Sequence, residues 1–353
     1  MDRNQILGWL SSVEHPGRDD RNVVELGMVE KVEILDGRIE VTLAFPKRPD
    51  PLKQYLVGAV KAAIYREAPG GTQVEVKTIV KEPAPERKTP ELSMDQISTV
   101  AHIIGIASGK GGVGKSTVAV NLAIALARLG YRVGLADADV YGPSVPIMTG
   151  TEGAVPEAVT EDGKDIIIPI EKYGVKWMSI GYFSKPGQAL IWRGPMACSA
   201  LKQMILQVKW DVLDYLLIDM PPGTGDIHIS LVQEIPVEGA VIVTTPQSVA
   251  LADVEKGVDM FRNPSINRRI FGIVENMSWF TPAELPDNKY FIFGKDGGAE
   301  MAERFGIPLL GQIPIVQSIR EGGDGGTPAA LGTRPDSMAF LDLASWLVEE
   351  VNS

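Results

Sequence analysis

The first part of the chain contains two patterns of apolar and polar residues. In two segments apolar residues recur at helical spacing. Three other segments are rich in β-forming residues, and in some of them apolar and polar residues alternate. The predicted helices span residues 4–14 and 51–66, and the predicted strands span residues 23–35, 38–45 and 72–80. Asp36-Gly37 is typical of a hairpin turn, and Pro51 suits the first turn of a helix. The pattern predicts a small α+β domain with the order α-β-β-α-β.

Short apolar runs alternate with helical segments from residue 103 onward. The predicted strands span residues 103–107, 132–136, 215–218, 239–244, 270–274 and 309–313. Helices are predicted at residues 116–129, 196–208 and from about Ser337 onward. This alternation predicts an α/β fold with a doubly wound, mostly parallel sheet. Such sheets bind ligands at the carboxyl ends of their strands, so we expect the ligand-binding and catalytic residues of this chain to lie there.

The two patterns are separated by residues 81–95. This segment is rich in proline and charged residues, cannot form a core, and is typical of a semi-rigid linker. We therefore predict a small domain over residues 1–80, a linker over 81–98 and an α/β domain over 99–353.

Composition narrows the classes of function. The chain has 353 residues, of which 44% are hydrophobic and 22% charged, and its net charge is −11. An acidic surface repels nucleic acid and anionic lipid, so we expect neither as a partner. No apolar run approaches the roughly 18 residues of a membrane-spanning helix, and the start of the chain is unlike a signal peptide. These features predict a cytoplasmic protein that does not bind membranes.

A glycine-rich stretch lies between the first strand and the first helix of the larger domain. It reads Gly109-Lys110-Gly111-Gly112-Val113-Gly114-Lys115-Ser116-Thr117 and fits the phosphate-loop pattern G-x-x-x-x-G-K-[ST]. Such a loop points backbone N–H groups at phosphate oxygens, aided by the helix N-terminus. Lys115 is expected to reach the β- and γ-phosphates and Ser116 to ligate Mg²⁺. A chance match is disfavoured, because strand, loop and helix follow in the required order.

Carboxylates end two of the other predicted strands. Asp137 and Asp139 follow the second strand, and Asp219 follows the strand 215–218. An apolar strand that ends in aspartate is typical of the metal side of a phosphate-transfer site, so Asp219 is expected to hold Mg²⁺ through its water shell. An acidic turn or helix cap is the alternative for Asp137 and Asp139, and the phosphate loop disfavours it. The loop after Asp219 is a candidate sensor of the γ-phosphate.

Lys110, directly after the first glycine, gives the loop a form that resembles the MinD/ParA branch of phosphate-loop ATPases. The resemblance implies that Lys110 reaches across a homodimer interface to the partner's nucleotide. It also implies that Asp139 positions the attacking water and that Asp137 assists around the metal.

Further motifs resemble the Mrp family, also called ApbC, over nearly the whole chain. They are the D-x-P-P-G-T-G-D run from Asp219 to Asp226, residues 142–144, residues 192–196 and, in the small domain, residues 24–29. The resemblance implies that the Asn276 amide binds the nucleotide base, with the loop at Pro314 packed beside it. The alternative is that the loop at Pro314 is an ordinary turn at the end of a strand, which would have the same sequence. No Asn-Lys-x-Asp guanine reader is present, so ATP is favoured over GTP.

Mrp proteins are regarded as carriers that hold an iron–sulfur cluster between two subunits through a C-x-x-C pair and pass it to apoproteins. Here the corresponding segment, residues 279–290, has no cysteine, and Cys198 is the single cysteine of the chain. Residues 45–51 also lack the cysteine found in many related small domains. His15, His102 and His228 have no metal-ligand spacing and are interpreted as surface or core histidines, and Cys198 as an inert helical thiol.

Three hypotheses follow from the motifs and the resemblance. The first is a dimeric ATPase of iron–sulfur protein maturation, with apo iron–sulfur proteins or assembly factors as partners. In that case an iron–sulfur cluster is implied by resemblance only, with its ligands in doubt. The second is an ATP-dependent dimer switch of the MinD/ParA type, and the third is a nucleotide-gated scaffold without turnover.

Overall fold

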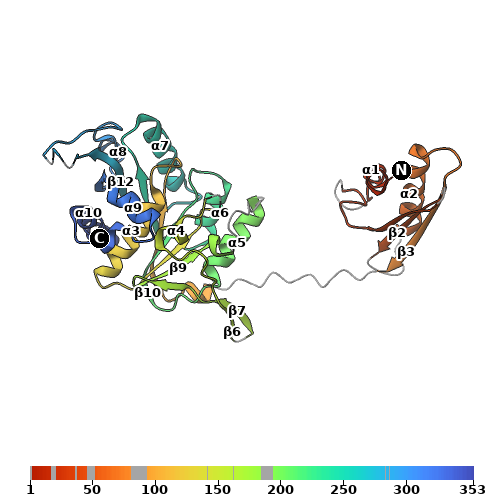
Figure 1. Ribbon diagram of the computed structural model, residues 1–353, viewed down its shortest axis with the longest axis horizontal. Coiled ribbons are helices and arrows are strands. Elements are labelled where there is room, and N and C mark those ends of the chain that lie inside the picture. Colours follow the sequence, from red (N-terminus) through yellow and green to blue (C-terminus); the bar gives the residue numbers. More distant parts are fainter. Residues whose placement is uncertain are drawn as a thin grey trace. The chain divides into compact units, whose positions relative to one another are not determined.

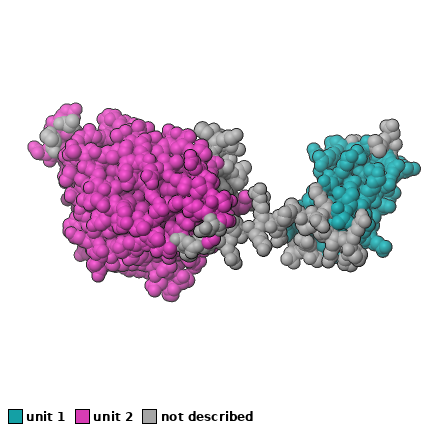
Figure 2. Space-filling view, turned by 90° about the horizontal axis from the view of Figure 1, so that it is seen from below, with its two compact units in different colours: residues 1–91 teal, residues 92–353 magenta. Residues whose placement is uncertain are grey.

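The computed structural model describes residues 2–16, 21–35, 38–45, 52–80, 94–140, 142–161, 163–183, 194–282, 284–285 and 287–353. The chain divides into two compact units, Met1–Glu91 and Leu92–Ser353 (Figure 2). Most of the predicted linker, residues 81–93, lies outside the described residues.

The first unit is a three-stranded sheet with two helices. Its elements are α1 (Arg3–Leu10), β1 (Val29–Leu35), β2 (Arg38–Phe45), α2 (Lys53–Glu67) and β3 (Gln73–Val80). The strand order is β1-β2-β3, with β1 antiparallel and β3 parallel to β2. Both helices bury apolar side chains against β2, where Ile39, Val41 and Leu43 are fully buried. A capping box at Asp2 and Gln5 begins α1.

The first predicted strand is wrong at its beginning. Strand β1 begins at Val29 instead of residue 23, because residues 23–27 form turns. The side chain of Asn22 accepts hydrogen bonds from the backbone N–H groups of Val24 and Glu25, which competes with strand pairing. Helix α1 ends at Leu10, four residues before its predicted end. The hairpin turn at residues 36–37 and the helix start at Pro51 lie outside the described residues.

The second unit is built on an eight-stranded sheet with the order β13-β12-β11-β4-β10-β5-β9-β8. Its strands are β4 (Val100–Ala107), β5 (Val133–Asp137), β8 (Ile170–Lys172), β9 (Val175–Ser179), β10 (Leu213–Asp219), β11 (Gly239–Thr244), β12 (Arg269–Phe280) and β13 (Leu309–Ile315). All neighbours are parallel except β8, which runs antiparallel to β9 at one edge. The predicted mostly parallel α/β sheet is confirmed.

Helices cover both faces of this sheet (Figure 1). One face carries α3 (Lys115–Arg128), α4 (Val145–Thr149), α9 (Gln317–Asp324), η3 (Ala329–Leu331) and α10 (Pro335–Asn352). The other carries α5 (Gly194–Leu206), α6 (Asp226–Glu234), α7 (Ser248–Arg262) and α8 (Gly297–Phe305). Two 3-10 helices, η1 (Met94–Ile97) and η2 (Ile180–Phe183), and a hairpin of β6 (Ala158–Glu161) and β7 (Lys164–Ile167) complete the unit.

The last helix packs inside its unit, as its acidic polar face predicts. Phe340, Leu343 and Leu347 of α10 are buried in the core that α3 shares. Arg128 at the end of α3 donates hydrogen bonds to the carbonyls of Ala330 and Gly332 and so anchors the segment that leads into α10. Among the described residues, no helix is long and apolar enough to cross a membrane.

The strand order determines where the predicted motifs meet. The glycine-rich stretch follows β4, which lies between β11 and β10. Strands β10 and β5 are in register so that Asp219 and Asp137, their last residues, are direct neighbours. The carboxyl ends of three adjacent strands therefore present the loop and both carboxylates at one edge of the sheet.

Candidate nucleotide-binding site

The glycine-rich loop passes between two close neighbours. At Gly109, a Cβ atom would lie 2.3 Å from the carbonyl oxygen of Asp253 in α7. At Gly114, which has a φ of 84° and precedes α3, a Cβ would lie 2.2 Å from Nδ2 of Asn276. The backbone of Asp253 leaves room only for glycine at position 109, and the positive φ of Gly114 is one that other residues rarely adopt, so α7 and β12 hold the loop from two sides.

Lys115 and Asp219 form a buried ion pair beneath this loop. Lys115 Nζ lies 2.5 Å from Asp219 Oδ1, and the two side chains are 6% and 0% exposed. Lys115 Nζ also lies 3.3 Å from Oγ of Ser116. The lysine expected to bind phosphate is therefore paired with the carboxylate expected on the metal side.

The second oxygen of Asp219, Oδ2, is buried and has no hydrogen-bond partner in the described parts of the chain. Burial raises the pKa of Asp219, whereas the charge of Lys115 and the nearby hydroxyl of Ser116 act to lower it. An unpartnered carboxylate oxygen beside a hydroxyl is a donor set of the hard oxygen kind that Mg²⁺ prefers. The residues present therefore fit a magnesium ion held by Ser116 and Asp219.

Asp137 is fixed beside this pair by three hydrogen bonds. Its carboxylate accepts from the hydroxyl of Ser179 at 2.9 Å, from the backbone N–H of Asp139 at 3.1 Å and from that of Val145 at 3.3 Å. Burial raises the pKa of Asp137 to about 7, and the charge of Asp219 adds to the increase. Two buried carboxylates thus share the positive charge of Lys115, an arrangement that favours an added cation.

Asp139 lies one turn of the loop beyond Asp137 and is half-buried. Its Oδ1 accepts a hydrogen bond of 3.3 Å from the backbone N–H of Gly142. Its charge contributes to the raised pKa of Asp219, which places it within electrostatic reach of the metal side.

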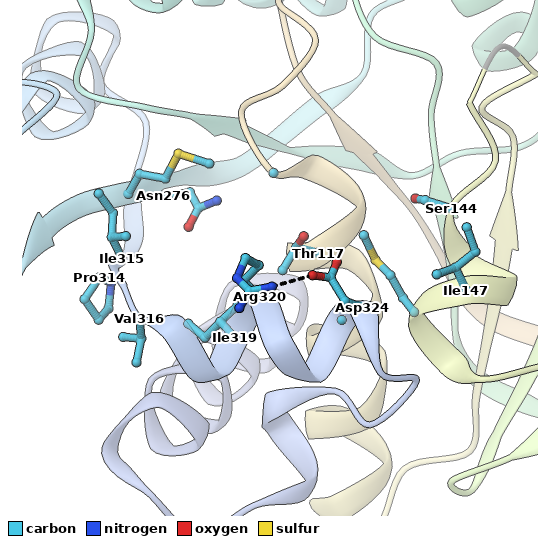
Figure 3. Close-up of a pocket in the computed structure, with 14 residues that line it drawn as sticks. Thr117, Ser144, Ile147, Asn276, Pro314, Ile315, Val316, Ile319, Arg320 and Asp324 are labelled. Carbon is cyan, nitrogen blue, oxygen red and sulfur yellow. Dashed lines mark hydrogen bonds and ion pairs between the residues drawn. The ribbon is translucent and has the colours of Figure 1, made fainter.

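A pocket of about 420 Å³ opens beside the loop (Figure 3). In Figure 3, Pro314 to Val316 lie on one side of the pocket, Ser144 and Ile147 on the other, and Thr117 between them. Gly114 and Asn276 also line the pocket. Its remaining lining residues are Met148, Met277, Ile319, Arg320, Gly323 and Asp324. The mostly apolar lining and the volume are typical of small-molecule sites. Asn276 and Pro314, both expected near a base, are brought together here, and Asn276 Nδ2 donates to the carbonyl of Val113 at 2.9 Å.

The chain after Asp219 also approaches the glycine-rich loop. The backbone N–H of Gly223 donates to the carbonyl of Ser108 at 2.9 Å, and Gly223 has a φ of 87°. Lys110 is exposed, so its charge is available outside the site.

Several residues of this region could not be predicted from the sequence. Ser179, which orients Asp137, ends β9, a strand of five residues that was not predicted. Arg320 and Asp324 form an ion pair at the pocket and belong to α9, which has no fully buried residue and hence no clear apolar pattern. The spacing Arg320 to Asp324, four residues apart, is the signal that could have found that pair.

The structure provides no cluster site among the residues it describes. No group of three or more histidine, cysteine or acidic side chains there is placed to hold a metal ion. Cys198 is half-buried in α5. In the segment expected to carry a C-x-x-C pair, the backbones of Phe280 and Tyr290 pair with each other.

Comparison with known families matches both units. A sequence model of the family described as "NUBPL iron-transfer P-loop NTPase" matches residues 99–348. A second, described as "Iron-sulfur cluster assembly protein", matches residues 3–77.

Curated relatives extend over most of the chain. An iron-sulfur cluster carrier protein of Aquifex aeolicus is 50% identical over 328 residues, which cover 86% of this chain and 88% of the relative. One from Synechocystis is 43% identical over 340 residues, covering 96% and 94%.

Solved structures share the fold of the larger unit. A nucleotide-binding protein from Archaeoglobus fulgidus in complex with ADP has a TM-score of 0.60 and 33% identity, over 70% of this chain and 94% of that one. The cell division ATPase MinD from Pyrococcus furiosus has a TM-score of 0.51 and 26% identity, over 70% and 99%. These matches confirm the resemblance to Mrp and MinD/ParA proteins, and the chain belongs to the family of NUBPL-type iron-transfer P-loop NTPases, preceded by a domain of the iron–sulfur cluster assembly family.

Proposed function

We propose that this protein is a cytoplasmic ATPase that acts as a dimer in the assembly or transfer of iron–sulfur clusters to apoproteins. The observation that carries the nucleotide part is the buried Lys115–Asp219 pair with the unpartnered Asp219 Oδ2 beside the glycine-rich loop. The family membership and the curated carriers support the cluster part.

In the proposed binding mode, backbone N–H groups of residues 109–117 surround the phosphates and Lys115 moves from Asp219 to the β- and γ-oxygens. Ser116 and Asp219 hold Mg²⁺, which neutralises phosphate charge when bound. Asn276 and Pro314 contact the base in the pocket beside the loop. The favoured nucleotide is ATP.

Hydrolysis in this proposal depends on positioning and charge, since phosphoryl transfer to water needs no covalent residue. Asp139 orients the attacking water. Asp137, held by Ser179 and two backbone N–H groups, assists around the metal and fixes the loop that carries Asp139. Lys110 completes the phosphate site of the partner subunit.

The dimer part gives a direct test. ATP is expected to drive two subunits together more strongly than ADP, and Lys110→Ala should raise the dimer dissociation constant about tenfold or more, because a charge-assisted contact to phosphate is lost. Sedimentation with ADP and with a non-hydrolysable ATP analogue measures both effects.

Lys209→Ala is the control, because Lys209 is a surface lysine that pairs with Glu161. That variant should assemble like the wild type. The same assembly state of the wild type with both nucleotides would contradict the proposed role of Lys110.

The proposed role in cluster transfer must account for too few cysteine ligands. A [4Fe–4S] cluster is ordinarily ligated by one thiolate per iron, and two copies of this chain supply one cysteine each. Glu284 and Asp287 are hard oxygen donors and poor substitutes for thiolate. We expect anaerobic reconstitution to give iron that small chelators remove, unless external thiols or a cysteine-bearing partner protein complete the site.

Iron and sulfide analysis before and after chelation measures this expectation. A chelator-resistant cluster in the purified protein that also survives Cys198→Ser would contradict it.

A second candidate function is an ATP-dependent switch or scaffold of the MinD/ParA type without a cluster, which the single cysteine favours. Turnover stimulated by a polymer or membrane would support the switch. Tight ATP binding with negligible turnover would support the scaffold.

A further inference from the structure

Glu275 is a buried carboxylate that the proposed nucleotide site does not use. It lies on β12 directly before Asn276, the residue proposed to contact the base, and is 0% exposed. Both of its carboxylate oxygens accept hydrogen bonds. Oε2 accepts from the backbone N–H of Gly298 in the first turn of α8 at 2.5 Å, and Oε1 accepts from Nε2 of Gln312 on β13 at 2.9 Å. The carboxylate therefore links three elements, β12, β13 and α8.

The surroundings of Glu275 are shaped for this contact. A Cβ at Gly298 would lie 2.8 Å from Cβ of Glu275 and 3.0 Å from its Oε2, so a larger residue would force the carboxylate to shift. The positive end of the α8 dipole favours a negative charge at this place. Nε2 of Gln312 also lies 3.3 Å from Oδ1 of Asp296, the residue before α8. The buried charge is thus compensated on two sides, as a carboxylate removed from water requires.

The bond between Glu275 and Gln312 lies beside both residues proposed to contact the base. The two residues are direct neighbours across β12 and β13, and Asn276 pairs with the residue before Pro314. Beyond Asn276 the regular pairing of the strands is interrupted, and Met277 has a φ of 58°, which residues other than glycine rarely adopt. The side-chain bond therefore joins the strands where their regular pairing is about to end.

The amide of Asn276 has a defined direction. Its Nδ2 donates to the carbonyl of Val113 at 2.9 Å, and a carbonyl oxygen can only accept. In the view of Figure 3, the amide oxygen lies between the side chains of Ile315 and Arg320, which line the pocket. This oxygen is an acceptor, so it suits the 6-amino group of adenine and opposes the 6-oxo group of guanine or hypoxanthine. The distinction requires that β12 hold the amide in place.

We propose that Glu275 is a positioning residue for selection of the base. Successive side chains of a strand point to opposite faces, so Glu275 is anchored on one face of the sheet while Asn276 lines the pocket on the other. The two hydrogen bonds of Glu275 fix the backbone of β12 and so hold the Asn276 oxygen where the 6-amino group of adenine would reach it. The inference rests on the proposed ATP site and assigns its base preference to a residue that touches no nucleotide.

Two substitutions at Glu275 separate its hydrogen bonds from its packing. Glu275→Met keeps a side chain of similar length and removes both bonds, whereas the amide of Glu275→Gln can accept from Gly298 N–H and donate to Gln312 once that amide turns over. We expect the wild type to bind magnesium ADP more tightly than magnesium IDP, which carries a 6-oxo group. In Glu275→Met this preference should fall roughly tenfold through weaker ADP binding, with IDP affinity unchanged, and Glu275→Gln should retain most of the preference. Titration calorimetry with the two diphosphates, which are not hydrolysed, measures both effects.

Gln312→Leu is a milder variant that removes only the bond between the strands and leaves the bond to Gly298 N–H. It should lower the preference for ADP over IDP by a smaller factor than Glu275→Met. If Glu275→Met does not fold, an unchanged preference in Gln312→Leu overturns the inference.

Met301→Ala is the packing control, because Met301 lies in α8 and is 5% exposed. It should lower thermal stability and change the affinities for ADP and IDP equally. A folded Glu275→Met variant that does the same, or that keeps the wild-type preference, would overturn the inference. A wild type that binds ADP and IDP equally would instead overturn the proposed contact between Asn276 and the base, and failure to bind either nucleotide would overturn the proposed ATP site.

Discussion

Lys115→Ala is expected to weaken ATP binding by roughly a hundredfold or more, because charge-assisted hydrogen bonds to the β- and γ-phosphates are lost together. Titration calorimetry with ATP and Mg²⁺ measures the loss. Lys115→Arg is the matched control, since it keeps the charge on a larger head group. It should retain part of the affinity, and wild-type affinity in Lys115→Ala would exclude the lysine from phosphate binding.

The same variant should show a characteristic pH dependence of stability. Without Lys115, Asp219 is a buried carboxylate that has lost its cationic partner, and its pKa, already raised by burial, rises further. An acid whose folded-state pKa is raised leaves stability intact below its unfolded pKa and reduces it as the pH increases. The free energy of unfolding of Lys115→Ala should therefore fall relative to wild type as pH rises above about 4, by a limiting value of about 3–5 kcal/mol. Denaturant titrations at several pH values, with Lys115→Ala/Asp219→Asn as the control that removes both charges, test this expectation.

Asp139→Asn is expected to separate hydrolysis from binding. The variant should bind ATP within about twofold of the wild type, yet its kcat should decrease by a factor on the order of 100 to 10,000, because the carboxylate that orients the attacking water is lost. Single-turnover phosphate release measures the chemical step apart from product release.

Asp165→Asn provides the comparison for the loss of an aspartate charge elsewhere. Asp165 lies on β7, where it accepts a hydrogen bond from Thr160, and this change should leave turnover unaffected. Wild-type turnover in Asp139→Asn would remove Asp139 from the catalytic role.

The sequence predicted the centre of the larger unit well, because several independent signals coincide there. The glycine-rich stretch requires specific residues at fixed offsets, and buried parallel strands are continuous apolar runs that stand out in the sequence. Asp219 and Asp137 follow from the same logic, since both end such strands. Their exact surroundings, with Lys115 paired to Asp219 and Asp137 on the neighbouring strand, depend on strand order and could not be predicted from residue spacing.

The periphery was predicted less completely for identifiable physical reasons. Strands β6 to β9 have three to five residues each, too few for a period to emerge, so Ser179 was missed as the partner of Asp137. Helix α9 contributes Arg320 to the pocket but has no fully buried residue. Because a helix without buried residues shows no clear apolar pattern, neither α9 nor Arg320 was predicted. His228, by contrast, is buried at 2% exposure, in agreement with its interpretation as a surface or core histidine.

The ion pair between Lys115 and Asp219 also has a consequence for nucleotide exchange. A phosphate-binding lysine that loses its phosphate in a site shielded from water becomes an unpaired buried cation. The free-energy cost of that unpaired charge would slow product release. Here Asp219 Oδ1 lies 2.5 Å from Lys115 Nζ and could replace the departing phosphate oxygen. In the proposed site, Asp219 would pair with Lys115 whenever a phosphate leaves, and we expect this exchange of partners to lower the barrier to ADP departure because no unpaired charge is left buried.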